Sequence, residues 1–327
     1  MQEGADYREP PPFDPEGEDG LTGPEPAPEV RCAVVTNAQH GERLDKLLVA
    51  LAPEFSRSHL QHLLERGHVQ VDGAPGGAAS RRLKGGQRLQ LELVPTDESR
   101  AFRPQAMALH ILFEDEHLLV LDKPAGLVVH PAPGHWSGTL LNGLLAHHAM
   151  AAQLPRAGIV HRLDKDTSGV MMVGKSLPAV TALVRDIAAR VVSRRYLALA
   201  HGLPLQAEFS VEAPIGRDPS VRVRMAVVAG GKPARTDVQV LATHEGVAAL
   251  RCTLHTGRTH QIRVHLASRG HPLLADALYG GKPLLGLQRQ ALHAAELSLA
   301  HPISRAPLAF SCAPPADFQQ AWQQVTG

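Results

Sequence analysis

The sequence predicts an α+β protein that consists of a small basic domain and a larger domain of mixed secondary structure. Strand-like runs follow one another with few helices between them, which favours α+β over regularly alternating βαβ units. The length of 327 residues exceeds that of one typical domain. A stretch at residues 95–105 mixes Pro, Ser, Thr and charged residues without periodicity, as a linker does. We therefore place the small domain at residues 31–94 and the larger domain at residues 106–327.

The charges are unevenly distributed, although the net charge at pH 7 is only +1. Residues 1–30 contain nine acidic residues and one basic residue, Arg8, a balance of −8, so the remainder carries +9. The same segment has seven prolines and few large apolar groups, too few to offset the entropy lost on ordering. We predict a disordered tail here, for which simple solvation is a sufficient role. The rest of the chain is basic.

The composition also bears on the cellular compartment. A hydrophobic content of 44% fits a soluble globular protein. The N-terminus is acidic where a signal peptide would be basic and apolar, and no apolar run approaches the ~18 residues of a membrane span. The odd number of cysteines argues against a disulfide framework, and their spacing does not indicate zinc: Cys32, Cys252 and Cys312. We expect a cytoplasmic protein with reduced thiols.

The small domain begins with two expected helices. Leucines recur at i, i+3, i+4 and i+7 from Leu44 to Leu51, which is the pattern of an amphipathic helix. Ser56 or Ser58 can cap a second helix, which Gly67 would end.

Two short strands and a set of cations complete this domain. Residues 69–71 alternate into an Asp72-Gly73 turn, and residues 89–93 alternate again. Basic residues outnumber the four acidic ones in this module, which favours phosphate binding, although such charges could merely solvate the helix surfaces. The eight predicted RNA-binding residues are Arg43, Lys46, Arg57, Arg66, Arg81, Arg82, Lys84 and Arg88.

The larger domain is expected to be rich in strands. A helix is predicted over residues 177–190, and another, capped by Thr259, carries Ile262 and Leu266 on one face and ends at Gly270. The predicted strands cover residues 111–113, 118–121, 127–129, 196–200, 221–228, 238–241 and 248–254.

Two carboxylates lie on a predicted turn between strand-like runs at residues 159–160 and 170–173. Asp164 and Asp166 are two positions apart and would point the same way at a strand end, but Asp166 could equally serve as an Asx-turn residue. Charges on a turn are usually solvated surface. Here they are crowded with His161, Arg162 and Lys165, which makes a reactive site the stronger interpretation.

The nine-residue word from His161 to Gly169 resembles the signature of the RluA/RluD family of RNA pseudouridine synthases. The resemblance covers the chain from about residue 31 to the C-terminus, and its other motifs lie at residues 122–126, 195–198, 256–263 and 290–294. Residues 131–135, 214–217, 224–227 and 231–234 are most similar to the RluD type, which acts on large-subunit ribosomal RNA. The resemblance implies a mixed, largely antiparallel sheet behind an S4-type RNA-binding domain. It also implies that the target is the stem-loop called helix 69, with RluC-type targets as the alternative.

The family match assigns roles to four residues. Asp164 corresponds to the catalytic aspartate, and Arg258 to a guanidinium that keeps this carboxylate ionised, bound through both oxygens. Tyr196 corresponds to the pocket tyrosine that stacks on uracil, and Arg162 to the arginine that fills the gap left by the extruded nucleotide. Each has a simpler alternative, since Tyr196 could be ordinary core and either arginine a surface phosphate contact.

Two other classes of function compete with this interpretation. A metal-dependent transferase could use Asp164 and Asp166 as a cation clamp, but the intervening Lys165 and the lack of a phosphate loop weigh against it. A non-catalytic RNA-binding protein would require diverged motifs. His260 and His265 are five residues apart and would diverge on a helix, so we expect no metal and no cofactor. The expected protein is a monomer whose partner is large-subunit ribosomal RNA or the precursor of the large ribosomal subunit.

Overall fold

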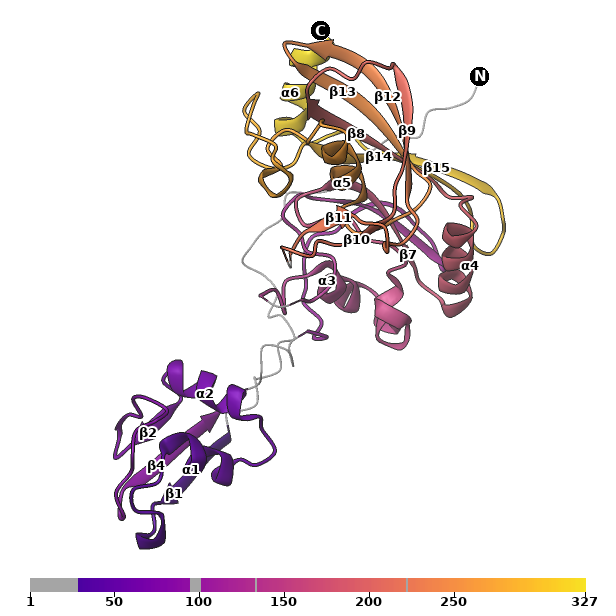
Figure 1. Ribbon diagram of the computed structural model, residues 1–327. Coiled ribbons are helices and arrows are strands. Elements are labelled where there is room, and N and C mark those ends of the chain that lie inside the picture. Colours follow the sequence, from indigo (N-terminus) through magenta and orange to yellow (C-terminus); the bar gives the residue numbers. More distant parts are fainter. Residues whose placement is uncertain (1–28, 95–100, 133, 222) are drawn as a thin grey trace. The chain divides into compact units, whose positions relative to one another are not determined.

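The computed structural model describes residues 29–94, 101–132, 134–221 and 223–327 (Figure 1). The chain divides into a small unit that ends at Thr96 and a large unit that begins at Asp97, and each is described by itself. The predicted tail falls mainly on residues 1–28 and the predicted linker partly on residues 95–100, all outside the described residues. The tail prediction is wrong for Glu29 and Val30, because both belong to a strand.

The small unit is a four-stranded antiparallel sheet in the order β1-β4-β2-β3 with two helices. Its first strand pairs Glu29 with Leu93, so the domain starts two residues earlier than the composition suggested. The elements are β1 (Glu29–Val34), α1 (Leu44–Leu51), α2 (Arg57–Glu65), β2 (Val69–Val71), β3 (Ala74–Pro75) and β4 (Arg88–Leu93), with a 3₁₀ turn at Asn37–Gln39.

The local predictions for this unit are confirmed. Helix α1 covers the predicted leucine pattern, and the Ser56 side chain accepts the His59 N–H at 3.3 Å to cap α2. Gly67 follows α2 with a φ of 85°, a conformation that glycine adopts readily. The leucines of both helices pack against alternate residues of β2 and β4, such as Val69 and Leu91, to form one apolar core.

The large unit is built on a nine-stranded sheet in the order β5-β6-β7-β14-β8-β13-β12-β9, with β15 also paired to β14. The pair β7 and β14 is parallel and the other described pairs are antiparallel, which confirms the predicted mixed, largely antiparallel sheet. Its strands are β5 (His110–Glu114), β6 (Leu118–Lys123), β7 (Ser168–Gly174), β8 (Ser193–His201), β9 (Glu208–Glu212), β12 (Arg235–His244), β13 (Val247–Leu254), β14 (Leu292–Ala300) and β15 (Pro307–Ser311).

Both faces of this sheet are covered, because alternate residues of its strands point to opposite sides. On β8, Ala198 packs in the central core, whereas Leu199 packs against Phe318 of α6. On β7, Met171 belongs to the central core, whereas Met172 packs with Leu183 of α4. The helices are α3 (Leu140–His147), α4 (Leu177–Ala188), α5 (Gln261–Ser268) and α6 (Ala316–Thr326), and the small ribbon β10 (Ile215–Arg217) with β11 (Met225–Val227) lies outside the large sheet.

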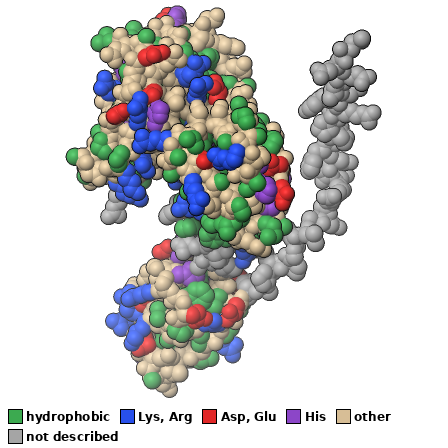
Figure 2. Space-filling model, turned by 90° about the vertical axis from the view of Figure 1, so that its right-hand side faces the viewer, with side chains coloured by type: hydrophobic (Ala, Val, Ile, Leu, Met, Phe, Trp, Pro, Cys, Tyr) green, Lys and Arg blue, Asp and Glu red, His purple; other side chains and the backbone are tan. Residues whose placement is uncertain are grey.

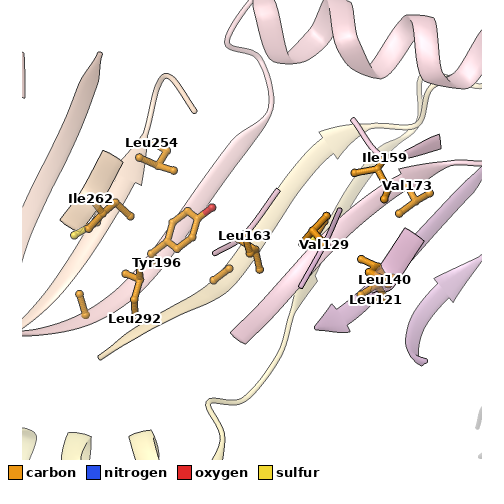
Figure 3. Packing of buried hydrophobic residues seen from close by; sticks show 14 of the residues in the cluster. Leu121, Val129, Leu140, Ile159, Leu163, Val173, Tyr196, Leu254, Ile262 and Leu292 are labelled. Atoms are coloured by element: carbon orange, nitrogen blue, oxygen red, sulfur yellow. The ribbon is translucent and has the colours of Figure 1, made fainter. Parts of the chain in front are cut away.

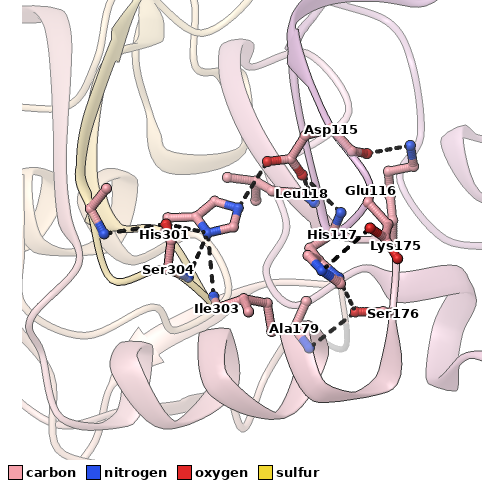
Figure 4. Close-up of polar contacts among 11 residues, drawn as sticks. Asp115, Glu116, His117, Leu118, Lys175, Ser176, Ala179, His301, Ile303 and Ser304 are labelled. Carbon is pink, nitrogen blue, oxygen red and sulfur yellow. Dashed lines mark hydrogen bonds and ion pairs between the residues drawn. The ribbon is translucent and has the colours of Figure 1, made fainter.

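Polar contacts tie the β5–β6 turn to neighbouring segments (Figure 4). The Asp115 carboxylate accepts the N–H groups of His117 and Leu118 at 2.8 and 2.7 Å. Its other oxygen lies 2.9 Å from Nε2 of His301, which follows β14. Lys175 donates to the Asp115 carbonyl at 2.5 Å, so this turn joins β6, β14 and the start of α4.

The linker prediction is wrong for residues 101–105, which pack on the large unit. Asn142 on α3 donates to the carbonyls of Ala101 and Arg103 at 3.2 and 2.8 Å, and Gln105 N–H donates to the Asn142 carbonyl at 3.0 Å. Ala101 is buried. An extended segment without periodicity can therefore be fixed by side-chain hydrogen bonds that no sequence pattern announces.

Three predicted strands and one predicted helix cap differ in the structure. Residues 127–129 form a loop, whose Val128 and Val129 carbonyls accept the first N–H groups of α3. Residues 159–160 contribute only an isolated bridge from Ile159 to Val173, and the predicted strand 221–228 shortens to β11. Thr259 does not cap α5; the N-cap is His260, whose φ is 57°.

Candidate active site

A pocket of about 960 Å³ opens in the large unit where the loop before β7 faces the start of α5. It brings together all four predicted catalytic residues. Among the residues that the structure describes, six arginines line it against one carboxylate, that of Asp164. Lys and Arg side chains also flank a hollow on the surface of this unit in Figure 2. The arginines are Arg156, Arg162, Arg190, Arg194, Arg258 and Arg263.

Asp164 lies on a tight turn rather than at a strand end. Its carbonyl accepts the Thr167 N–H at 3.1 Å, which places Lys165 and Asp166 at the corner of the turn. The expectation that Asp164 and Asp166 share one face of a strand is therefore wrong. The Asp164 side chain is 14% exposed and lines the pocket, whereas Asp166 is absent from the pocket lining.

A buried lysine fixes the backbone next to Asp164. Lys123, at the end of β6, is fully buried and its ammonium donates to the carbonyls of Pro124, Leu127 and Lys165 at 2.7, 3.0 and 3.0 Å. Burial lowers the pKa of Lys123 to about 8. The three carbonyls compensate the desolvated charge, and the ammonium links the loop after β6 to Lys165, the residue next to Asp164.

The guanidinium that holds Asp164 belongs to Arg263 on α5. Its Nη1 donates to Asp164 Oδ2 at 3.0 Å, while Nε and Nη2 donate to the two oxygens of Asp276 at 2.7 and 2.8 Å. Burial lowers the pKa of Arg263. The hydrogen bonds to Asp276 and the charge of Asp164 raise it by more than burial lowers it, so the pKa lies above its ordinary value. The ring of Tyr279 lies under the guanidinium, 5.0 Å away.

The prediction that Arg258 holds the Asp164 carboxylate is wrong. Arg258 precedes α5 and its Nε donates to the Pro233 carbonyl at 3.1 Å, so its guanidinium is committed to the pocket rim. The sequence did contain a signal for Arg263. It lies between Ile262 and Val264 in a helix with few charges, and a cation in such a run needs a buried carboxylate partner.

His260 is a further polar group beside Asp164. The Tyr279 hydroxyl accepts the Met225 N–H at 3.0 Å, which leaves its own proton to bind His260 Nδ1 at 2.8 Å. In that tautomer His260 Nε2 carries a proton and lies 3.9 Å from Asp164 Oδ1. Burial lowers the pKa of His260, which favours this neutral form.

Tyr196 forms the apolar wall of the pocket. It lies on β8 among Leu254, Ile262 and Leu292, and only 5% of it is exposed (Figure 3). Burial raises the pKa of Tyr196 to about 12, so the phenol is neutral at physiological pH. The two interpretations of this residue are compatible, since it is both core and pocket lining. Arg162 is exposed at the pocket edge.

Many of the predicted RNA-binding residues of the small unit have partners within the chain. Asp45 is buried on α1 and binds both Arg43 and Arg57, at 2.8 and 2.7 Å. These two hydrogen bonds, in that order, hold the pKa of Asp45 well below its usual range. The other contacts are Lys46 with Glu42, Arg81 with the Gly76 carbonyl, and Arg82 with the Gly41 carbonyl.

Within the described residues, no group of three or more His, Cys, Asp or Glu side chains is arranged to hold a metal ion. In the same part of the chain, no helix is long and apolar enough to cross a membrane.

Comparison with known proteins agrees with this geometry. Residues 117–268 match the RNA pseudouridylate synthase family, and residues 42–89 match the S4 domain. The chain is 47% identical over 293 residues to ribosomal large subunit pseudouridine synthase D of Nitrosomonas europaea, which covers 87% of this chain and 85% of the relative. The enzyme of the same name from Xanthomonas campestris pv. campestris is 44% identical over 304 residues, 89% of this chain and 91% of the relative.

A solved structure shows the same fold. Human RNA pseudouridylate synthase domain containing 4 aligns with a TM-score of 0.53 and 26% identity, over 66% of this chain and 92% of that one. The sequence motifs, the Asp164 pocket and these relatives lead to one identification: the chain is an RNA pseudouridine synthase of the RluA/RluD family with an N-terminal S4 domain.

Proposed function

We propose that this enzyme converts uridines of large-subunit ribosomal RNA to pseudouridine, in the stem-loop called helix 69, with Asp164 as its single catalytic carboxylate. The observation that carries the chemistry is that, in the described part of the chain, Asp164 is the one carboxylate lining a pocket with six arginines. The relatives from Nitrosomonas and Xanthomonas, named for the large ribosomal subunit, support the substrate. The substrate is ribosomal RNA, free or in a precursor of the large subunit, and the enzyme acts as a cytoplasmic monomer.

The reaction is an isomerisation that needs one well-placed carboxylate. The bond from C1′ to N1 breaks, the base turns, C1′ joins C5, and the C5 proton is replaced by one on N1. Asp164 attacks the sugar or the base, or removes the C2′ proton. Each route requires the ionised carboxylate of Asp164 in a pocket from which the bound nucleotide excludes water. Arg263, at 3.0 Å, supplies the positive charge that maintains this form.

The pocket wall is suited to hold a uracil ring. Tyr196 presents a buried, neutral aromatic side chain on which an extruded base can stack. Arg162, exposed at the edge, is placed to enter the gap that the base leaves in the RNA. Arg258 belongs to the same rim and contributes to RNA binding rather than to the charge state of Asp164.

The two carboxylates of the signature provide the test of the chemistry. Asp164→Asn should bind RNA but form no detectable pseudouridine, because the amide is nearly isosteric and lacks the charge that Arg263 stabilises. Asp166→Asn, at the corner of the turn, is the matched control and should lose at most about tenfold in rate, or ~1.4 kcal/mol of barrier. Single-turnover rates on one ribosomal RNA fragment measure both. Equal, near-total losses would favour a cation clamp, and robust activity of Asp164→Asn would refute the assignment.

The target is tested separately. Pseudouridine mapping in ribosomal RNA from cells that lack the gene should show unmodified uridines in helix 69. If that loop is fully modified and other large-subunit positions are not, the target is of the RluC kind and the helix 69 assignment is wrong. Activity on a correctly folded fragment should also persist in excess EDTA, since the proposed steps use no metal.

A further inference from the structure

Arg194 is a buried cation that the chemistry described above does not use. It lies on β8 two residues before Tyr196, so both side chains leave the same face of the strand and both line the pocket. Arg194 is only 5% exposed. Its Nε is buried without a hydrogen-bond partner, and within the described residues no ion pair or hydrogen bond to its guanidinium is found.

This isolation is unusual for a buried guanidinium. Buried charges are normally paired, because desolvation without compensation is costly. The other deeply buried arginine of the pocket, Arg263, has two carboxylates within 3.0 Å. An unpaired buried charge in a functional pocket is therefore expected to gain its partner from the ligand.

The surroundings leave room for such a partner. A Cβ atom at Gly257 would come within 3.0 Å of Arg194 Nη1, so a glycine at this position gives the guanidinium its space. His161, also in the pocket lining, has a pKa lowered to about 3 by burial, with a smaller contribution from the charge of Arg194. The imidazole is therefore neutral and does not add a second charge next to the arginine.

The ligand that fits is a phosphate rather than a base carbonyl. As far as the described residues go, the pocket lining carries six arginines and one carboxylate, and that carboxylate is already bound by Arg263. A full negative charge compensates a desolvated guanidinium better than the dipole of a uracil carbonyl does, and arginine binds phosphate oxygens through two N–H groups. The RNA backbone brings one phosphate on each side of the nucleotide that enters the pocket.

We propose that Arg194 is an anion subsite that binds a phosphodiester phosphate adjacent to the reacting uridine and so positions its ribose beside Asp164. This inference rests on the proposed function, since it takes RNA with an extruded uridine as the ligand. Arg194 thus receives the charge partner that the protein does not provide, at the moment when the nucleotide seals the pocket.

The test is a cycle between the side chain and the phosphate. Synthetic RNA fragments carry a neutral methylphosphonate on the 5′ or the 3′ side of the target uridine, each with a matched 2′-deoxy control that keeps the ordinary phosphate. Single-turnover kcat/KM is measured for wild type and Arg194→Gln. With wild type, we expect one of the two methylphosphonates to lower kcat/KM about tenfold. On the control RNA, Arg194→Gln should also lower kcat/KM about tenfold. When the two changes are combined, kcat/KM should fall by less than a further twofold.

The control variants separate this role from a structural one. Arg195→Gln changes the next residue, which is exposed and pairs with Glu296 at 3.0 Å, and it should leave the methylphosphonate effect intact. Arg194→Met should raise the melting temperature of the large unit, because it removes an unpaired buried charge, while it lowers kcat/KM. A residue that only supports the fold would lose stability and activity together.

The outcomes are distinct. If the losses in kcat/KM from the variant and from the methylphosphonate multiply, the two changes act independently and the phosphate assignment is wrong. If neither methylphosphonate lowers kcat/KM of wild type, the assignment is also wrong, and Arg194 contacts the base instead. If wild type forms no pseudouridine in the helix 69 fragment, the proposed target is wrong, and the same cycle is then measured at the uridine identified by mapping. The fate of the Arg194 inference is thus decided separately from that of the target.

Discussion

Replacement of Arg263 should be far more damaging than replacement of Arg258, although both lie in the same eight-residue motif. Arg263 is 8% exposed and its three hydrogen bonds join Asp164 to Asp276. Coulomb's law at 3.0 Å gives a gross attraction of roughly 5–6 kcal/mol for one such pair at an effective dielectric constant near 20. Breaking a buried pair typically costs about 3–5 kcal/mol, because the remaining charge is left uncompensated.

Lysine at position 263 keeps the charge but loses the planar fork, so it can bind one carboxylate well and not both. We expect Arg263→Lys to lower the single-turnover rate at saturating RNA by at least about 100-fold, or ~2.7 kcal/mol, and the unfolding free energy by about 3 kcal/mol. Arg258→Gln should stay within about tenfold of wild type once RNA is saturating, since the contact found for its guanidinium among the described residues is with the Pro233 carbonyl and not with Asp164.

Rates should be compared well below each variant's melting temperature, which circular dichroism provides. Should Arg263→Lys not fold, Asp276→Asn keeps the contact between Arg263 and Asp164 and weakens only its anchor, with an expected loss of about tenfold. A near-normal rate for Arg263→Lys together with an inactive Arg258→Gln would refute this reasoning and restore the assignment made from sequence.

Three further changes test other parts of the structure. The pKa of His161, about 3 in the folded protein, lies below the ordinary ~6.5, so protonation favours the unfolded chain. The unfolding free energy of wild type should fall by about 2 kcal/mol between pH 8 and pH 5, and that of His161→Gln should not show this fall. Urea unfolding, followed through the fluorescence of Trp136 and Trp322 in the large unit, measures both. Gly158→Ala should lower the unfolding free energy by more than about 3 kcal/mol in the same assay, because its Cβ would lie 1.9 Å from the Gly174 carbonyl oxygen and its φ is 82°. Gly280→Ala is the control: its φ is 87° but no atom lies near the added Cβ, so it should lower the unfolding free energy by only about 1 kcal/mol. Asp45→Asn should weaken RNA binding about threefold to tenfold in a filter-binding assay, because it releases Arg43 and Arg57, whereas Glu54→Gln on the same unit should not; equal affinities would show that these arginines do not contact phosphate.

Local pattern was sufficient where an element is defined by its own residues. Helix α1 and the alternation of β4 followed from the spacing of leucines, and the Ser56 cap from a hydroxyl placed before an apolar face. Strand β14, in the middle of the large sheet, was not predicted, because it is short of β-branched residues and its first half is buried on both faces, so that burial alternates only in its second half. The first two residues of β1, Glu29 and Val30, were assigned to the acidic tail, since the partner strand β4 lies some sixty positions further along the chain.

The site shows the same limit at the scale of single side chains. The sequence located the segments that carry Asp164, Tyr196 and Arg263, because each of these residues lies in a recognisable motif. It did not single out three other arginines that line the pocket, Arg156, Arg190 and Arg194. It did not determine which arginine faces Asp164, since that depends on where α5 begins. The helix starts after His260, whose left-handed backbone turns the chain, and this places Arg263 toward Asp164 and Asp276 while Arg258 stays on the preceding loop.

If α5 began two residues later, the residues of the motif would be the same, but the guanidinium of Arg263 would move away from the Asp164 carboxylate. We therefore expect the partner of Asp164 to depend on the backbone conformation at His260 as well as on the motif residues. Substitution of His260 by Gly tests this step: glycine tolerates the φ of 57°, so α5 should start at the same place and the rate should fall only by the loss of the imidazole. His260→Val, which disfavours that φ, should cost further activity, in proportion to the displacement of Arg263 from Asp164.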